Sequence, residues 1–353
     1  MKNNSTFLRE RAYVWGEDGT RFITHQLTAV LDVKRIVDMM GKLMAGSKPA
    51  FRVYSKHGRQ WVDKTPLGET ILLCLKSGLQ EIDEHFPTHR HSPLYTLFKR
   101  FLGPFVHLGG RAWPVDVPML NAAVAKIRAF AKGKALGRRM DNLKRAEREN
   151  AKSCKRLLHA MRARYSKLLV VRLDLEYFSE FCPGSGFRGQ AMTLKQAQAH
   201  RDRFLDYLRK GPYASHLAGY MWKLEYGLEK GHHFHMAIFF DGQRVARDIT
   251  IGDILGQYWQ EKVTDSKGMF FNCNKKKEAY ERCGIGMVNR GDDDKWSALV
   301  AALRYLTKVD LYLRFRPEGR ARTFGTGGPY GGVEPIHNLA PAVGLKVNAF
   351  ASG

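Results

Sequence analysis

The stretch GHHFHMAIFF, residues 231–240, constrains the fold of this chain more than any other part of the sequence. Side chains two positions apart in an extended strand point to the same face. His233, His235, Ala237 and Phe239 would therefore share one face, and bulky apolar residues would fill the other. A strand that is apolar on both sides is typical of the centre of a sheet that is covered on both faces.

The segments around this strand predict the class of the fold. Alternating apolar residues predict a strand over 168–178, and two strands joined by GLEKG predict a hairpin. The predicted elements, in order, are a strand at 168–178, a helix at 193–210, hairpin strands at 220–226 and 232–240, a helix at 245–263, strands at 269–272 and 285–288, and a helix at 296–308. This order favours an α+β fold with a central antiparallel sheet backed by helices, not an alternating parallel one.

The rest of the chain predicts a mostly helical N-terminal domain. Helical spacing of apolar residues indicates helices at 27–44, 67–86, 94–101 and 119–130, and residues 51–62 indicate a short hairpin around His57 and Gly58. We therefore expect a helical accessory domain over 1–131, a basic helical connector over 132–167, a catalytic domain over 168–325 and a flexible tail over 326–353. The sequence does not indicate what the accessory domain binds.

The charge of the chain favours a polyanionic partner. Lys and Arg number 58 against 34 Asp and Glu, a net charge of +24, which favours nucleic acid first and an anionic membrane second. The connector is either a solvated helix face or a helix that follows phosphates and binds in a salt-dependent way.

The sequence also predicts where the protein works. No apolar run approaches the roughly 20 residues needed to span a bilayer, and the N-terminus lacks the apolar core of a secretory signal. The five scattered cysteines contain no CxxC pair. We therefore expect reduced thiols, a cytoplasmic location and no membrane partner, and the resemblance described below implies that the cell is a bacterial host.

A metal site is predicted at the open end of the 231–240 strand. His233 and His235 have the spacing to hold one divalent cation, and Glu225 can face them across the hairpin. Two imidazoles and one carboxylate leave positions open for water or phosphate. His232 points the other way and ranks below the pair. Further carboxylates that can approach the site are Glu229, Asp174 and Glu176. The alternative is a pair of histidines hydrogen-bonded in the core.

A second group of residues lies on the last predicted helix, WSALVAALRYLTK. At about 100° per residue, its apolar residues form one face, Tyr305 lies almost opposite that face and Lys308 about 60° round from Tyr305. A tyrosine needed for packing would lie within the apolar stripe. Tyr305 is therefore either a nucleophile or an ordinary surface tyrosine.

The strand LLVVRLDLEY, the strand HFHMAIFF and the later helix with YLTK resemble the three ordered motifs of the HUH endonucleases. Within this superfamily the chain most resembles the filamentous-phage (inovirus-type) replication initiators, found in phages and bacterial prophages. The segments FHMAIFFDG, GQYW and ALRYLTK carry this resemblance, which covers roughly residues 165–325.

The resemblance implies a rolling-circle replication initiator that nicks and rejoins single-stranded DNA at an origin. Tyr305 would form a 5′-phosphotyrosine link, beside Mg²⁺ or Mn²⁺ held by His233, His235 and Glu225. Lys308 would steady the charge on the phosphate or the phenolate. The next tyrosine, Tyr312, lies beyond the predicted helix end, which indicates a single nucleophile. Host replication proteins are a further candidate partner.

Two other functions fit the same residues. A non-catalytic DNA-binding prophage regulator on this fold would use the positive charge and give Tyr305 no special role. A metal-dependent nuclease would use the HHxH residues to activate water and leave no protein attached to DNA.

Overall fold

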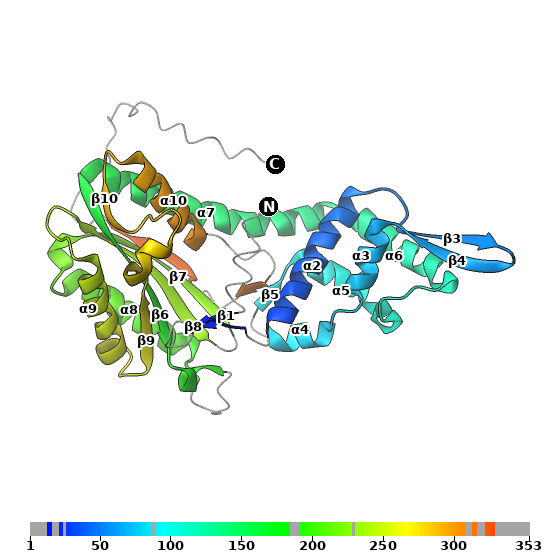
Figure 1. Cartoon of the computed structure of the whole chain (residues 1–353), viewed down its shortest axis with the longest axis horizontal. Helices are drawn as coiled ribbons and strands as arrows, with labels where there is room; N and C mark the ends of the chain where they lie inside the picture. The colour runs from blue at the N-terminus through cyan, green and yellow to red at the C-terminus, as the bar shows by residue number, and fades with distance from the viewer. Residues whose placement is uncertain are drawn as a thin grey trace.

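The computed structural model describes residues 13–15, 21–23, 26–86, 89–183, 191–227, 230–307, 313–315 and 322–328. Figure 1 shows two lobes joined by one long helix. We define the N-terminal lobe as the described part of residues 26–131, and the C-terminal lobe as the described part of residues 167–327 without 313–315.

Helices dominate the N-terminal lobe. Its elements are α2 (Gln26–Ala45), β3 (Phe51–Lys56), β4 (Arg59–Lys64), α3 (Pro66–Cys74), α4 (Leu79–His85), α5 (Pro93–Phe101), η1 (Gly103–Leu108), η2 (Pro114–Asp116) and α6 (Val117–Ala131). The buried stripe of α2, including Ile36 and Met40, packs with Phe98 of α5 and Leu120 of α6. This single apolar cluster gives the lobe a core of its own.

The predicted helix over 67–86 is wrong as one element. Thr65 accepts a hydrogen bond from the Gly68 amide, and Pro66 occupies the first turn. The helix ends at Cys74, however, and α4 begins at Leu79. The apolar spacing continues across this gap, but Ser77 and Gly78 are weak helix formers and the chain turns there.

The predicted hairpin around His57 and Gly58 is confirmed. Strands β3 and β4 pair antiparallel on either side of these two residues. His57 and Gly58 have positive φ, 52° and 71°, as a two-residue type I′ turn requires. In Figure 1 the two strands extend away from the helices at the far end of the lobe.

One continuous helix, α7 (Lys134–Arg164), connects the lobes. Its 31 residues span about 46 Å. Leu136 packs into the N-terminal core, whereas Leu157 and Met161 pack into the C-terminal lobe. Between these two contacts the apolar stripe is interrupted near Glu147 and Asn150, where the helix crosses from one lobe to the other. A polar helix segment between two domains needs no apolar face.

The predicted α+β fold is confirmed. The sheet consists of β6 (Lys167–Tyr177), β7 (Leu217–Gly227), β8 (Gly231–Asp241), β9 (Gly268–Asn272), β10 (Gly286–Asn289) and β12 (Phe324–Gly327). Its order is β10–β6–β8–β7–β12, with β9 also on β6, and each pair is antiparallel. Strand β8 is therefore central, as its two apolar faces predict.

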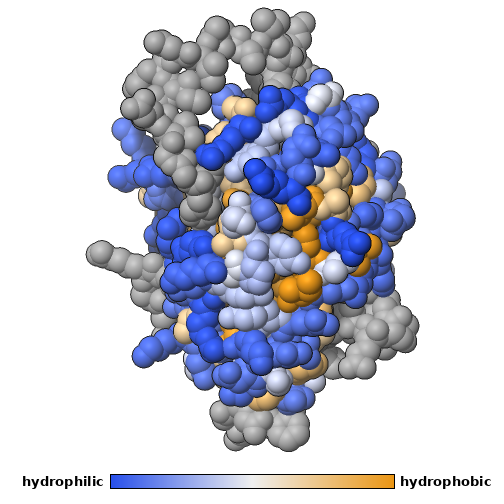
Figure 2. Space-filling view, turned by 90° about the vertical axis from the view of Figure 1, so that its left-hand side faces the viewer, coloured by the Kyte–Doolittle hydropathy of each residue, from blue (hydrophilic) through white to orange (hydrophobic). Residues whose placement is uncertain are grey.

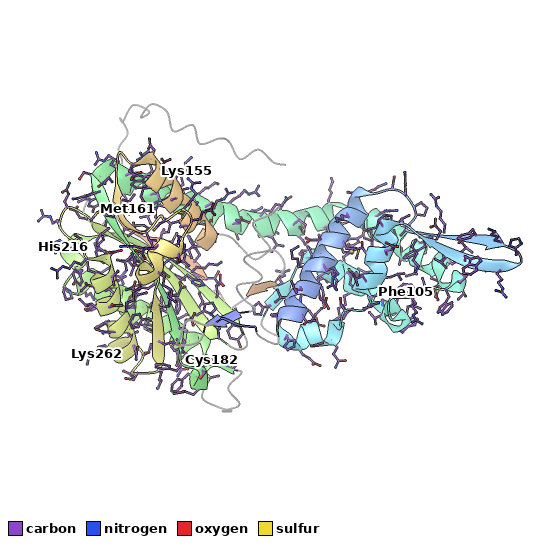
Figure 3. All side chains as sticks on the ribbon, viewed as in Figure 1. Phe105, Lys155, Met161, Cys182, His216 and Lys262 are labelled. Carbon is purple, nitrogen blue, oxygen red and sulfur yellow. The ribbon has the colours of Figure 1, made fainter. Side chains whose placement is uncertain are left out.

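Helices cover both faces of this sheet. On one face α8 (Leu194–Lys210), α9 (Asp248–Tyr258) and the π-helical turn η6 (Trp259–Val263) pack on Phe234, Met236 and Ile238. On the other, α7 and α10 (Asp293–Thr307) pack on Ala237 and Phe239. The buried Met161 and the exposed Lys155 of α7 (Figure 3) mark the two sides of that covering helix. The surface of the C-terminal lobe that faces away from the N-terminal lobe is mainly hydrophilic (Figure 2).

Short elements complete the described chain. They are β1 (Tyr13–Trp15), β2 (Arg21–Ile23), β5 (His89–His91), η3 (Ser179–Phe181), η5 (Ala214–His216), η7 (Cys273–Ala279) and β11 (Leu313–Phe315). Strand β11 follows α10 in the chain but pairs with β5, next to the N-terminal lobe, before β12 returns to the sheet. No helix in the described ranges combines the length and apolar character needed to cross a bilayer.

The C-terminal boundary of the sheet differs from the prediction. Thr326 and Gly327 were expected in a flexible tail but pair with Met221 and Tyr220 of β7. The basic composition before this strand suggested a tail, whereas backbone pairing with β7 holds the segment. Residues 329–353 of the predicted tail lie outside the described residues.

Asn274 closes a gap at the edge of β6, between the strands β10 and β9. Its side-chain amide donates to the Val170 carbonyl (2.9 Å) and to Asp248 (2.8 Å), and its oxygen accepts from the Arg172 amide (2.8 Å). The side chain is fully buried and thus replaces a missing strand for two backbone groups.

We expect Asn274→Ala to lower the free energy of unfolding by about 2–4 kcal/mol, because it leaves buried backbone groups of β6 without partners. Chemical denaturation measures this change. Gln243→Ala, which removes a solvent-exposed hydrogen bond to Ser166, is the control and should cost less than about 0.5 kcal/mol. Equal effects of the two substitutions would contradict the role given to Asn274.

Candidate metal centre

Three neighbouring strands bring polar side chains together at one end of the sheet. Strand β8 lies between β6 and β7, with His233 opposite Glu225 and His235 opposite Asp174. Directly opposite residues of antiparallel strands point to the same face. This face also carries Ala237 and is the one that α7 and α10 cover.

The structure brings Glu225, His233 and His235 into one cluster. Their ligand atoms all lie within 4.8 Å of one another. Glu225 Oε2 is 3.7 Å from His233 Nε2 and 3.8 Å from His235 Nε2, which is too long for hydrogen bonds. Ligands about 2.1 Å from one tetrahedral ion are about 3.4 Å apart, so these atoms need little movement to share a cation.

The other nitrogen of each ring has its own acceptor. His235 Nδ1 lies 2.6 Å from Asp174 Oδ1, and His233 Nδ1 lies 3.3 Å from the Gly231 carbonyl oxygen. An ionised carboxylate and a carbonyl can only accept, so each Nδ1 donates its proton and Nε2 faces Glu225. Metal-binding histidines are held in this way, with a carboxylate or carbonyl behind each ring.

Charge interactions within the cluster are strong because its groups are buried. Burial raises the pKa of Asp174, but His235 and Arg172 outweigh burial and hold this pKa well below its usual range. Burial lowers the pKa of His235, but Asp174 and then Glu225 outweigh it and raise this pKa to about 9. A cation at His235 Nε2 would therefore take the place of a proton.

Lys223 is a member of the site that sequence reasoning missed. Its ammonium lies 2.5 Å from Glu225 Oε1, and both side chains are almost fully buried. Lys223 precedes Glu225 by two residues and lies opposite His235, so strand alternation could have identified it. The ammonium offsets the carboxylate charge and provides a positive group next to the histidines.

Two other residues considered as ligands, Glu176 and His232, are not part of the cluster. Glu176 faces Lys230, 3.4 Å away. His232 has its ring 4.7 Å from the ring of Tyr226, and burial, followed by the charge of His233, lowers its pKa to about 4. Glu229 lies outside the described residues.

The helix that carries Tyr305 packs over the same face of the sheet as the cluster. Leu299, Leu303 and Leu306 of α10 are buried together with Ala237, two residues from His235. Tyr305 lies in the last turn of α10, but its side chain is outside the described part of the structure, and so is the whole of Lys308.

Residues 131–327, more than half of the chain, match the family model of the YagK/YfjJ C-terminal domain. The chain belongs to this family. The YagK/YfjJ domain comprises α7 and the C-terminal lobe, and its match ends with the last residue of β12. No protein of curated function and no solved structure matches the chain significantly. The family name states no activity.

We expect Asp174→Asn to weaken divalent-cation binding to the YagK/YfjJ domain by about 10- to 100-fold, because it removes the charge that holds His235. Calorimetric titration with Mn²⁺ measures the affinity. Glu176→Gln, on the same face of β6 but paired with Lys230, is the matched control and should leave the affinity unchanged. Equal affinities of wild type and Asp174→Asn would contradict the role given to Asp174 in holding His235.

Proposed function

We propose that this YagK/YfjJ family member is a rolling-circle replication initiator that nicks and rejoins single-stranded DNA at a divalent-metal site. The observation that carries the proposal is the proximity of His233, His235 and Glu225, each with one ligand atom within 4.8 Å of the others. Such a set leaves coordination positions open for substrate, as a catalytic site requires. Mg²⁺ or Mn²⁺ is the proposed cofactor.

The order of motifs along the chain supports this function. The strand with Asp174, the HxH strand and the later helix with Tyr305 follow one another as in the HUH endonucleases and the inovirus-type initiators. In this chain the first two motifs are adjacent strands, and the helix covers the face on which the histidines lie.

The residues define the proposed chemistry. The Tyr305 hydroxyl loses its proton and attacks a phosphorus of single-stranded DNA. The bond from phosphorus to the 3′-oxygen breaks, that oxygen takes up a proton, and the 5′-phosphate stays on the tyrosine. A bound divalent cation supplies polarisation of a non-bridging phosphate oxygen. Lys308, three residues after Tyr305 in the sequence, would stabilise the negative charge.

Rejoining follows the same path in reverse. A 3′-hydroxyl attacks the phosphotyrosine, the diester forms again and the phenol is released, so no nucleotide is consumed. Because Tyr305 is the single proposed nucleophile, each active site would hold one phosphotyrosine link at a time and rejoin one strand end to it. Tyr312, the next tyrosine in the sequence, lies outside the described residues.

Positive charge around the cluster supports a DNA substrate. Lys223 lies beside Glu225, and Arg172 lies 3.5 Å from Asp174. The connecting helix α7 presents further cations to solvent. Its exposed basic residues are Lys134, Arg138, Arg139, Lys144, Arg145, Arg148, Lys152, Lys155, Arg156 and Arg164. Cations along a helix neutralise phosphates and release counterions.

Incubation with Mn²⁺ and a 3′-labelled library of single-stranded oligonucleotides tests the proposal. We expect a labelled covalent adduct that survives denaturing electrophoresis and requires the metal. Tyr305→Phe should abolish the adduct, because the attacking hydroxyl is gone. Tyr258→Phe, on the helix that covers the opposite face of the sheet, is the matched control and should retain it.

Two outcomes would contradict the proposal. Metal-dependent cleavage that persists in Tyr305→Phe and leaves no attached protein would identify a nuclease that activates water. Tight DNA binding with neither adduct nor cleavage, under every metal tested, would identify a DNA-binding regulator.

A further inference from the structure

We infer that the β3–β4 hairpin of the N-terminal lobe is a binding element for unpaired DNA. The two strands extend beyond the helices of the lobe (Figure 1) and expose nearly all their side chains. The inference relies on the proposed function only for the choice of DNA over RNA. It concerns a part of the chain that the YagK/YfjJ domain does not include.

The register of the hairpin places two aromatic rings side by side. Tyr54 and Trp61 are directly opposite in the two strands, so they share one face of the ribbon. Each is 51% exposed, although large aromatic residues in a small protein lobe normally contribute to its core. The lobe packs its own core without them.

Positive side chains surround the two rings on that face. Arg52 opposes Asp63 on one side of the rings, and Lys56 opposes Arg59 on the other. All four of these side chains are exposed. The face thus combines two rings, three cations and a single carboxylate, and it is complementary to a polyanion that carries flat apolar groups.

The base of the hairpin is anchored, which fixes the direction of the ribbon. Phe51 is buried in the lobe, and its amide and carbonyl both bond to the Asn121 side chain (3.3 and 2.8 Å). The type I′ turn at His57 and Gly58 closes the other end. A ribbon held in this way presents its rings with little loss of conformational entropy on binding.

Single-stranded DNA fits this face better than other nucleic-acid forms. Bases of an unpaired strand can stack on exposed rings while cations contact the phosphates. In a duplex, base faces are already stacked, and a β-ribbon in the major groove reads base edges with polar side chains. Basic residues also protect exposed strand edges from pairing with other proteins, but edge protection gives no reason for the two exposed rings.

The binding site would be remote from the nicking site. The hairpin lies at the end of the N-terminal lobe that points away from the sheet (Figure 1). A single DNA strand bound to the hairpin could follow the exposed cations of α7 toward the cluster at His233. The hairpin would thereby help to select unpaired DNA for the proposed reaction.

Fluorescence anisotropy of the full chain tests the inference. The probe is an oligothymidylate long enough to follow α7 from end to end, measured in EDTA so that no cleavage occurs. We expect Tyr54→Ala with Trp61→Ala to weaken binding at least about tenfold, since stacking contributes roughly 1–3 kcal/mol per base. Tyr54→Phe with Trp61→Phe should restore most of the affinity. Ile254→Ala, an exposed apolar residue of α9, is the control and should bind as wild type.

A second set of variants tests the cations. Replacing Arg52, Lys56 and Arg59 with Gln should reduce the slope of log affinity against log salt by about 0.7 for each phosphate that the hairpin no longer neutralises. The matched control replaces three other exposed cations of the lobe, Lys48, Arg111 and Lys126, with Gln. We expect the control to change the slope less.

Three results would overturn the inference. The first is unchanged oligothymidylate affinity of the Tyr54→Ala, Trp61→Ala double variant. The second is failure of the Tyr54→Phe, Trp61→Phe double variant to restore affinity. The third is an equal loss of affinity of the alanine variant for a DNA duplex of the same length. Because these measurements need neither metal nor adduct, they can succeed even if the chain does not nick DNA. Conversely, an adduct with unchanged oligothymidylate binding would refute only the role of the hairpin.

Discussion

The pairing of β8 between β6 and β7 is the constraint on which the candidate site depends. It sets His235 opposite Asp174 and His233 opposite Glu225. A shift of one residue would turn both histidines to the other face of the sheet. The apolar residues that alternate with them, such as Phe234 and Met236, prevent this shift because they are fully buried under α8 and α9. Core packing thus determines the geometry of the polar cluster.

Burying so many charged groups at one end of a sheet is costly unless each one is paired. The structure meets this cost with pairs within β6 and β7 and one pair between β6 and β8. Arg172 faces Asp174, Asp174 accepts from His235, and Lys223 faces Glu225. Glu225 Oε2 lies 3.7 Å from His233 Nε2 and 3.8 Å from His235 Nε2, and both distances are too long for a hydrogen bond. A shared cation would bind between these three atoms, in place of the proton on His235.

The two lobes meet near this cluster as well as through α7. His89 Nε2 lies 3.1 Å from the carbonyl oxygen of Tyr226, the residue after Glu225. The β5 strand that carries His89 also pairs with β11, which follows α10 in the chain. The N-terminal lobe therefore contacts the strand end that provides the carboxylate ligand.

Much of this arrangement could be predicted because local patterns decide it. The alternation around His233 and His235 predicted the central strand. The short hairpin connection predicted that Glu225 faces the histidines, and the register places it opposite His233. Lys223 was missed because a lysine in a strand usually indicates solvent. The break at Ser77 and the return of β12 depend on contacts between distant segments, which periodicity does not contain. Asn274 could not be predicted either, since its role exists only where β9 and β10 leave a gap along β6.

His233, His235 and Glu225 are proposed to hold one divalent cation. Crystals soaked in Mn²⁺ and measured at the manganese absorption edge provide the decisive test. We expect an anomalous difference peak between both Nε2 atoms and Glu225 Oε2, with Asp174 still hydrogen-bonded to His235 Nδ1. Absence of a peak between the two rings, with His235 Nε2 within hydrogen-bond distance of Glu225, would contradict the proposed metal site.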